Sequence, residues 1–171
     1  MRLFDPDPDA ERKVAEMLDN ARRVWRNLSM MPPLREGSLE VVGGAENAAA
    51  GADFVQESAP EREDLKRELL ARASRAAAPD VVFASSTSGL LPTRLQVDMA
   101  HPERQVIGHR FNPVYLLPLV EVCAGAQTTI EAIQRAEAIY RAVGMSPLRV
   151  RKEVPGFIAD RLLEALWRGA L

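Results

Sequence analysis

Short apolar runs rich in β-branched residues alternate along this chain with longer segments of helical periodicity. The clearest run is residues 80–84, Asp-Val-Val-Phe-Ala, which predicts a buried strand. Further strands are predicted at residues 39–42, 53–57, 105–108, 117–123 and 148–150. Helices are predicted at residues 7–28, 61–77, 128–143 and 155–171, with a short one ending at residue 50. Because this alternation is typical of βα units around a mostly parallel sheet, the sequence predicts the α/β fold class.

Composition limits the kinds of partner. The chain has 171 residues, of which 47% are hydrophobic and 27% charged, and its net charge of −2 offers no basic surface for nucleic acid. No uncharged apolar run is long enough to span a membrane, and the N-terminus lacks the apolar core of a signal peptide. Cys123 is the only cysteine, which excludes an internal disulfide and a cysteine-rich zinc site. We therefore expect a cytoplasmic protein with no metal, nucleic-acid or membrane partner.

His109 is one of only two histidines and follows the predicted strand 105–108, just before the turn Asn112-Pro113. Glu121 is the polar exception within the apolar run 117–123. A carboxylate held against one imidazole nitrogen fixes the tautomer and makes the other nitrogen a proton acceptor. The two residues are therefore a candidate general base and its orienting partner, although a lone His–Glu pair can also be a surface coincidence.

A cluster of small hydroxyl residues, Ser85 to Ser88, follows the strand 80–84. In open α/β sheets ligands bind beyond the carboxyl ends of the strands, so this cluster is a candidate binding segment. The same residue types also serve as helix N-caps, and that structural interpretation remains open.

Asp5 follows a short apolar run and precedes a helix. Dinucleotide-binding folds hold ribose hydroxyls with an acid in this position, about 20 residues beyond a G-x-G-x-x-G turn. No such turn precedes Asp5, and Gly43-Gly44 lacks the required spacing. We expect a doubly wound Rossmann-type NAD-binding domain that lacks its first strand, glycine-rich turn and first helix. Taken alone, Asp5 would be an ordinary turn residue beside proline.

Four segments resemble the 3-hydroxyacyl-CoA dehydrogenase superfamily in order and spacing: SSTSG, GHRFNP, PLVEV and VPGFIADRL. The resemblance covers nearly the whole chain and implies oxidation of a 3-hydroxy group with NAD. It implies a truncated NAD-binding domain over residues 1–153, and over residues 154–171 the first helix of an all-α domain that closes the substrate cleft. It further implies a small 3-hydroxy acid as substrate and a homodimer for the full-length parent.

The resemblance also implies residue roles. His109 matches the general base, Glu121 its carboxylate partner, Ser88 the serine that binds the substrate oxygen, and Asn112 the asparagine of the turn after the histidine. On the cofactor side, Asp5 matches the ribose-binding acid, and the positions near the cofactor are Glu61, Lys66 and Ser86. By default, Glu61 and Lys66 would belong to a solvated helix face.

Two residues depart from the acyl-CoA pattern. Asp160 stands where those enzymes have asparagine, and Arg110 where they often have an aromatic residue. The segments SSTSGLLP, NPVYLLPLVE and DRLLEALWR most resemble the branch that oxidises the zwitterion carnitine to 3-dehydrocarnitine, and each charge could meet one end of it. The aromatic candidates for its quaternary ammonium are Trp25, Trp167, Tyr115 and Phe111.

Several alternatives stay open. Arg110 and Asp160 could be a structural ion pair, and the substrate could be a 3-hydroxyacyl-CoA or L-gulonate. The chain could also be a non-catalytic gene fragment. We expect the 171 residues alone to be unstable, to bind NAD poorly and to turn over no substrate, because removing a central strand exposes two sheet edges.

Overall fold

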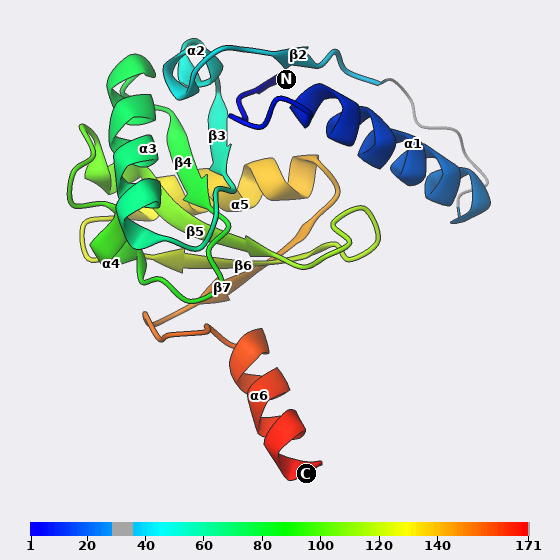
Figure 1. The fold of residues 1–171 in the computed structure, drawn as a ribbon. Coiled ribbons are helices and arrows are strands. Elements are labelled where there is room, and N and C mark those ends of the chain that lie inside the picture. Colours follow the sequence, from blue (N-terminus) through cyan, green and yellow to red (C-terminus); the bar gives the residue numbers. More distant parts are fainter. Residues whose placement is uncertain (29–35, 171) are drawn as a thin grey trace.

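The computed structural model describes residues 1–28 and 36–170. Its strands form two sheets (Figure 1). The smaller sheet pairs β1 (Arg2–Leu3) with β2 (Glu40–Val41) in parallel. The larger sheet has the order β3-β4-β5-β6-β7. Its strands are β3 (Phe54–Glu57), β4 (Val82–Ser85), β5 (Gln105–Arg110), β6 (Leu119–Ala124) and β7 (Ser146–Val150).

The larger sheet is mostly parallel, and the predicted α/β class is confirmed. Strands β3, β4 and β5 run parallel to one another, and β7 runs parallel to β6. The exception is the β5–β6 pair, which is antiparallel. These two strands are joined by the short loop 111–118, whereas a parallel return requires a longer crossover such as a helix.

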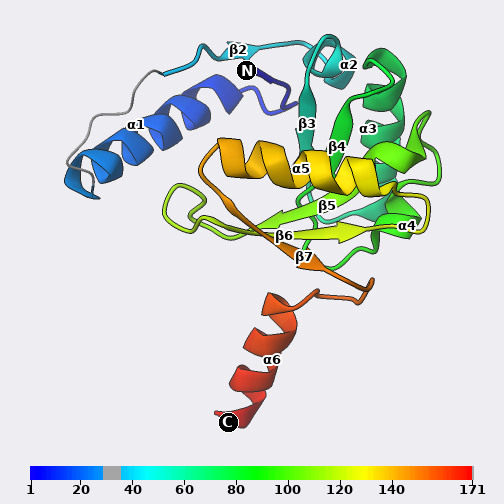
Figure 2. The same ribbon diagram turned by 180° about the vertical axis from the view of Figure 1, so that it is seen from behind.

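Helices cover both faces of the larger sheet. The described helices are α1 (Ala10–Leu28), α2 (Ala45–Ala49), α3 (Glu63–Ala76), α4 (Pro92–Leu95), the 3-10 helix η1 (Pro102–Arg104), α5 (Ile130–Ala142) and α6 (Ala159–Gly169). Those that cover the two faces are α3 with α4 and, on the opposite side, α5. Helix α3 lies in front of the sheet in Figure 1, and α5 lies in front after the half-turn of Figure 2. The sheet is therefore the middle layer of an α/β/α sandwich, which is why its central strands β4, β5 and β6 are buried on both sides.

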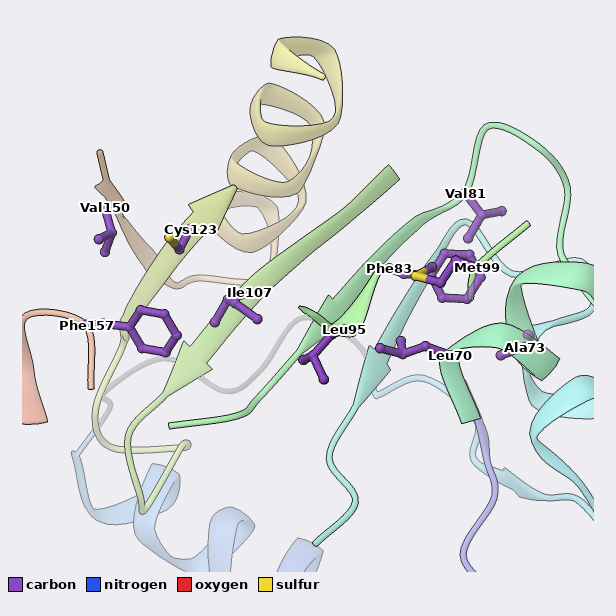
Figure 3. Packing of buried hydrophobic residues seen from close by; sticks show 11 residues of the cluster. Leu70, Ala73, Val81, Phe83, Leu95, Met99, Ile107, Cys123, Val150 and Phe157 are labelled. Atoms are coloured by element: carbon purple, nitrogen blue, oxygen red, sulfur yellow. The ribbon is translucent and has the colours of Figure 1, made fainter. Parts of the chain in front are cut away.

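Alternate residues of the strands enter two separate cores. Phe83, Ile107 and Cys123 face the side of α3 and α4, where Phe157 completes the cluster (Figure 3). Val82, Val106 and Val122 face α5 on the opposite side, together with Tyr140. Successive strand residues point to opposite faces, so neighbours in the sequence serve different cores.

Two helices bury little of their apolar surface. The predicted apolar face of α1 is largely open to solvent: Met17 is 60% and Trp25 52% exposed, and Ala10 is the buried residue of this helix. Helix α6 has no buried residue and extends away from the sheet in both views (Figures 1 and 2). Pro32 and Pro33, whose rings forbid continuation of the first helix, lie outside the described residues. Within the described parts of the chain, no helix is long and apolar enough to cross a membrane.

Candidate active site

The antiparallel pairing of β5 with β6 places His109 directly opposite Glu121. Side chains at such paired positions lie on the same face of a sheet. His109 Nδ1 lies 2.8 Å from Glu121 Oε2, and both side chains are buried. With Glu121 ionised, Nδ1–H donates to the carboxylate, and Nε2 is left as the proton acceptor.

The second oxygen of Glu121 is bound by the turn before α6. Glu121 Oε1 accepts hydrogen bonds from the backbone N–H of Ile158 at 2.9 Å and of Ala159 at 3.0 Å. This turn requires left-handed backbone at Gly156 (φ +74°) and at Phe157 (φ +44°). A carboxylate is well placed there, because the first N–H groups of a helix have no partner within it. Glu121 therefore links His109 to the start of α6.

Two aromatic rings pack against the imidazole. The His109 ring centroid lies 4.7 Å from that of Phe111 and 5.8 Å from that of Phe157. Phe157 is fully buried and points into the core cluster (Figure 3). Together with the Glu121 contact, these rings restrict the imidazole to one orientation.

The hydroxyl segment after β4 is bound to Glu61. Glu61 Oε1 accepts hydrogen bonds from Ser88 N and Gly89 N, both at 3.1 Å, and from the Thr87 hydroxyl. The N-cap interpretation of Ser85 to Ser88 is wrong, because α4 begins only at Pro92. Glu61 itself precedes α3, so it does not lie on the helix face that was its default assignment.

Lys66 is buried on α3, which corrects its default placement on a solvated face. Its side chain is 1% exposed. Nζ lies 3.0 Å from Glu57 Oε1, 2.7 Å from the carbonyl of Ala59 and 3.7 Å from Glu61 Oε2. Sequence reasoning missed Glu57, which also accepts the Ser85 hydroxyl. The available signal was a carboxylate at the last position of a strand.

Four of the predicted residues line one polar hollow of about 240 Å³ at the ends of β4 and β5. Its lining consists of Ser58, Ser86, Ser88, Arg110, Asn112 and Val114. Arg110 Nη2 donates to Ser58 Oγ at 3.0 Å. The hollow is therefore lined by hydroxyls, an amide and a guanidinium, which suits a polar ligand.

Two predicted residues lie elsewhere. Asp5 follows β1 in the smaller sheet and is exposed, and its Oδ1 accepts the N–H of Asp7 at 2.9 Å. Asp160 lies on α6, where it lines a different hollow with Leu163, Glu164 and Trp167. Among the described residues, Arg110 and Asp160 form no ion pair with each other, so the ion-pair interpretation is wrong for this structure.

These features define a class. A mostly parallel sheet between helices, with polar side chains gathered at its strand ends and a buried histidine–carboxylate pair, is typical of a nucleotide-binding dehydrogenase domain. Residues 1–154 match the family model of the 3-hydroxyacyl-CoA dehydrogenase NAD-binding domain, and the chain belongs to this family. NAD is accordingly its cofactor.

Curated relatives resemble the chain along its whole length. L-carnitine dehydrogenase of Pseudomonas putida is 54% identical over 168 residues, which are 98% of this chain and 52% of that enzyme. The enzyme of the same name from Burkholderia mallei is 56% identical with the same coverage. An L-carnitine dehydrogenase/betainyl-CoA thioesterase of Rhizobium meliloti is 47% identical over 100% of this chain and 34% of its own length. The chain thus spans about half the length of the first two.

Solved structures share the fold. A 5-formyl-3-hydroxy-2-methylpyridine 4-carboxylic acid 5-dehydrogenase, described as an NAD-dependent dismutase, superposes with a TM-score of 0.91 at 33% identity. The superposition covers 99% of this chain and 55% of the chain of that dehydrogenase. The 3-hydroxybutyryl-CoA dehydrogenase of Escherichia coli gives a TM-score of 0.82 at 27% identity, covering 99% and 37%. These relatives are oxidoreductases that use different substrates.

Proposed function

We propose that this chain provides the NAD-binding half of an enzyme that oxidises the 3-hydroxy group of a small hydroxy acid, with L-carnitine as substrate and 3-dehydrocarnitine as product. The observation that supports the chemistry is the buried contact of 2.8 Å between His109 and Glu121. The names of the relatives with 54% and 56% identity support the substrate.

In this proposal His109 Nε2 accepts the proton of the substrate hydroxyl, while Glu121 holds the ring in place and stabilises the imidazolium that forms. Ser88 and Asn112, which line the polar hollow, bind the substrate oxygen in this proposal. Bound NAD supplies the acceptor for the hydride that leaves the same carbon.

Asp5 fits the ribose of NAD. Asp5 is exposed beyond a parallel strand, and its Oδ2 has no hydrogen bond within the described chain, so it can accept from ribose hydroxyls. Glu61, Lys66 and Ser86 form the rest of the proposed cofactor side. Lys66 and Glu57 fix the loop that contains Glu61, and Glu61 in turn fixes the hydroxyl segment.

Arg110 and Asp160 are the proposed substrate charges, one for each end of a zwitterion. We further propose two units, residues 1–153 and residues 154–171, and a homodimer of the complete enzyme. Helix α6 has no buried residue, and its exposed Leu162, Leu166 and Trp167 support a second unit there. The 171 residues alone are proposed to be inactive.

The test is a substrate panel with the protein encoded by the complete reading frame that contains these residues. Initial rates of NAD reduction would be compared for L-carnitine, 3-hydroxybutyrate, L-gulonate and 3-hydroxybutyryl-CoA. We expect the highest kcat/KM for L-carnitine. A higher kcat/KM for the thioester or for L-gulonate would contradict the substrate assignment, and no reduction of NAD with any of them would contradict the enzyme assignment.

A matched variant tests the role of Asp160. If its carboxylate meets the ammonium end, Asp160→Asn should lower the ratio of kcat/KM for L-carnitine to that for 3-hydroxybutyrate. Asp98→Asn, an exposed carboxylate paired with Arg67, is the control. An unchanged ratio in Asp160→Asn would remove this residue from the proposal.

A further inference from the structure

Arg110 has a positive charge without a carboxylate partner in the described part of the chain. Among the described residues it forms no salt bridge, and its one side-chain hydrogen bond is the 3.0 Å contact with Ser58. Its Nε is buried without any partner. The side chain as a whole is half-buried. Leaving a buried N–H donor unpaired is costly, so the Nε group favours an acceptor that the described residues do not supply.

Arg110 lines the polar hollow, and the other residues of the lining offer further hydrogen-bond donors. Ser58, Ser86 and Ser88 contribute hydroxyls, and Asn112 contributes an amide. No Asp or Glu side chain is in that lining. A hollow with one fixed positive charge, several neutral donors and no negative charge is complementary to a small anion.

Ser58 positions the guanidinium of Arg110. It follows β3, while Arg110 ends β5, so their hydrogen bond joins two strands that are separated by β4. The backbone beneath is tightly packed: a Cβ at Gly108 would lie 1.8 Å from the Tyr140 hydroxyl, which itself donates to Gln56 Oε1 at 2.6 Å. The packing at Gly108 therefore positions the backbone near Arg110, and the hydrogen bond to Ser58 positions its guanidinium.

We infer that this hollow is a carboxylate-binding site and that Ser58 is a specificity-determining residue, because it holds the Arg110 guanidinium toward the free carboxylate of the substrate. The inference rests on the proposed function. It deepens that function by stating what the site selects: a hydroxy acid with a free carboxylate in preference to an uncharged acyl derivative. A planar carboxylate can take two parallel hydrogen bonds from a guanidinium, whereas an amide or thioester offers one neutral oxygen.

The kinetic test uses the protein of the complete reading frame, with 3-hydroxybutyrate and its uncharged analogue 3-hydroxybutyramide. Ser58→Ala should raise KM for the acid by about 3- to 10-fold and leave kcat and the amide kinetics unchanged. Arg110→Gln should lower kcat/KM for the acid by about 30-fold or more, again sparing the amide. In the Arg110→Gln background, Ser58→Ala should have no further effect. The matched controls are Ser146→Ala and Arg151→Gln, two exposed positions outside the hollow.

A binding test separates this inference from the reaction. The same protein is labelled with ¹⁵N-arginine for NMR, and the Nε signal of Arg110 is identified as the one missing from the spectrum of Arg110→Gln. This signal should shift when 3-hydroxybutyrate is added and should not shift with 3-hydroxybutyramide. A shift by inorganic phosphate and none by the acid would assign the hollow to a phosphate and overturn the inference. Equal effects of Ser58→Ala on acid and amide would overturn it as well. Acid binding without NAD reduction would support the site and contradict the proposed function.

Discussion

At the scale of single residues, the buried pair of Lys66 and Glu57 is the most consequential interaction. The two side chains are 1% and 6% exposed, and Glu57 also accepts hydrogen bonds from the Ser85 hydroxyl and from Ala59 N. Burial makes an ion pair costly to break, because the remaining charge has no partner and little water. The pair thus fixes the loop after β3 that contains both Ser58 and Glu61.

Replacing Lys66 should therefore destabilise the fold. We expect Lys66→Met to lower the free energy of unfolding by about 3–5 kcal/mol, since it leaves Glu57 charged and buried. Arg67 is on the same helix as Lys66 and forms a partly exposed ion pair with Asp98. Arg67→Gln removes that pair and should lower the free energy of unfolding by less than about 1 kcal/mol. Urea unfolding followed by circular dichroism measures both, and equal losses would show that the buried pair has no special weight.

Cys123 should be chemically quiet. Burial, followed by the negative charges of Glu153 and Glu121, raises the pKa of this thiol to about 12. Because the thiolate is the reactive form, a raised pKa leaves almost none of it at about pH 8. We expect slow reaction with an aromatic disulfide reagent in the folded protein and fast reaction after unfolding in urea. Rapid stoichiometric labelling of the folded protein would contradict this.

At the scale of elements, the contact of β5 with α5 leaves no room for a side chain at Gly108. A Cβ there would meet the Tyr140 hydroxyl at 1.8 Å and its Cζ at 2.8 Å. Tyr140 is buried in the second core, so it cannot swing away. The strand that contains His109 and Arg110 can thus pack closely against α5 because residue 108 is a glycine.

Gly108→Ala should consequently destabilise the protein by about 1–3 kcal/mol through overpacking. Gly43→Ala, whose Cβ would meet nothing within 4 Å, should have little effect. In a Tyr140→Phe background the cost of Gly108→Ala should fall, because the closest clashing atom is gone. Thermal unfolding of the four variants and the wild type measures this, and a cost that does not change in the Phe background would contradict the packing account.

The elements also show what the sequence could predict. The apolar run 80–84 and the alternation of runs and amphipathic segments were sufficient for the α/β class, because they depend on local pattern. The antiparallel direction of β6 relative to β5 was not predicted, since strand direction depends on the loop between the strands. The resemblance implied a position near the cofactor for Lys66, but its burial was not predicted, because nothing local reveals that Glu57 and Ala59 surround it. Phe157 beneath His109 depends on two left-handed residues that the segment PGF only suggests.

At the scale of the whole molecule, stability should be concentrated in the five-stranded sheet. Strands β4 and β5 are almost entirely buried between two cores. In contrast, α6 has no buried residue, and β1 with β2 forms a separate two-stranded sheet. Regions with few buried contacts open at lower free energy than the core.

Hydrogen exchange followed by mass spectrometry tests this distribution on the 171-residue chain. We expect the amides of β4, β5 and β6 to exchange slowest, and those of α1 and α6 to exchange early. Slow exchange of α6 equal to that of β5 would contradict the distribution and would indicate that α6 is covered, for example by a second copy of the chain.

His109 has the central role in the proposed reaction, that of the general base. The direct measurement is kcat for NAD reduction by the protein of the complete reading frame, on its best substrate, for His109→Gln and for the control His101→Gln. We predict a fall of about 10²–10⁴-fold for His109→Gln and no comparable loss for His101→Gln, whose ring lies outside the site beside Glu103. A kcat within tenfold of the wild type for His109→Gln would contradict the account.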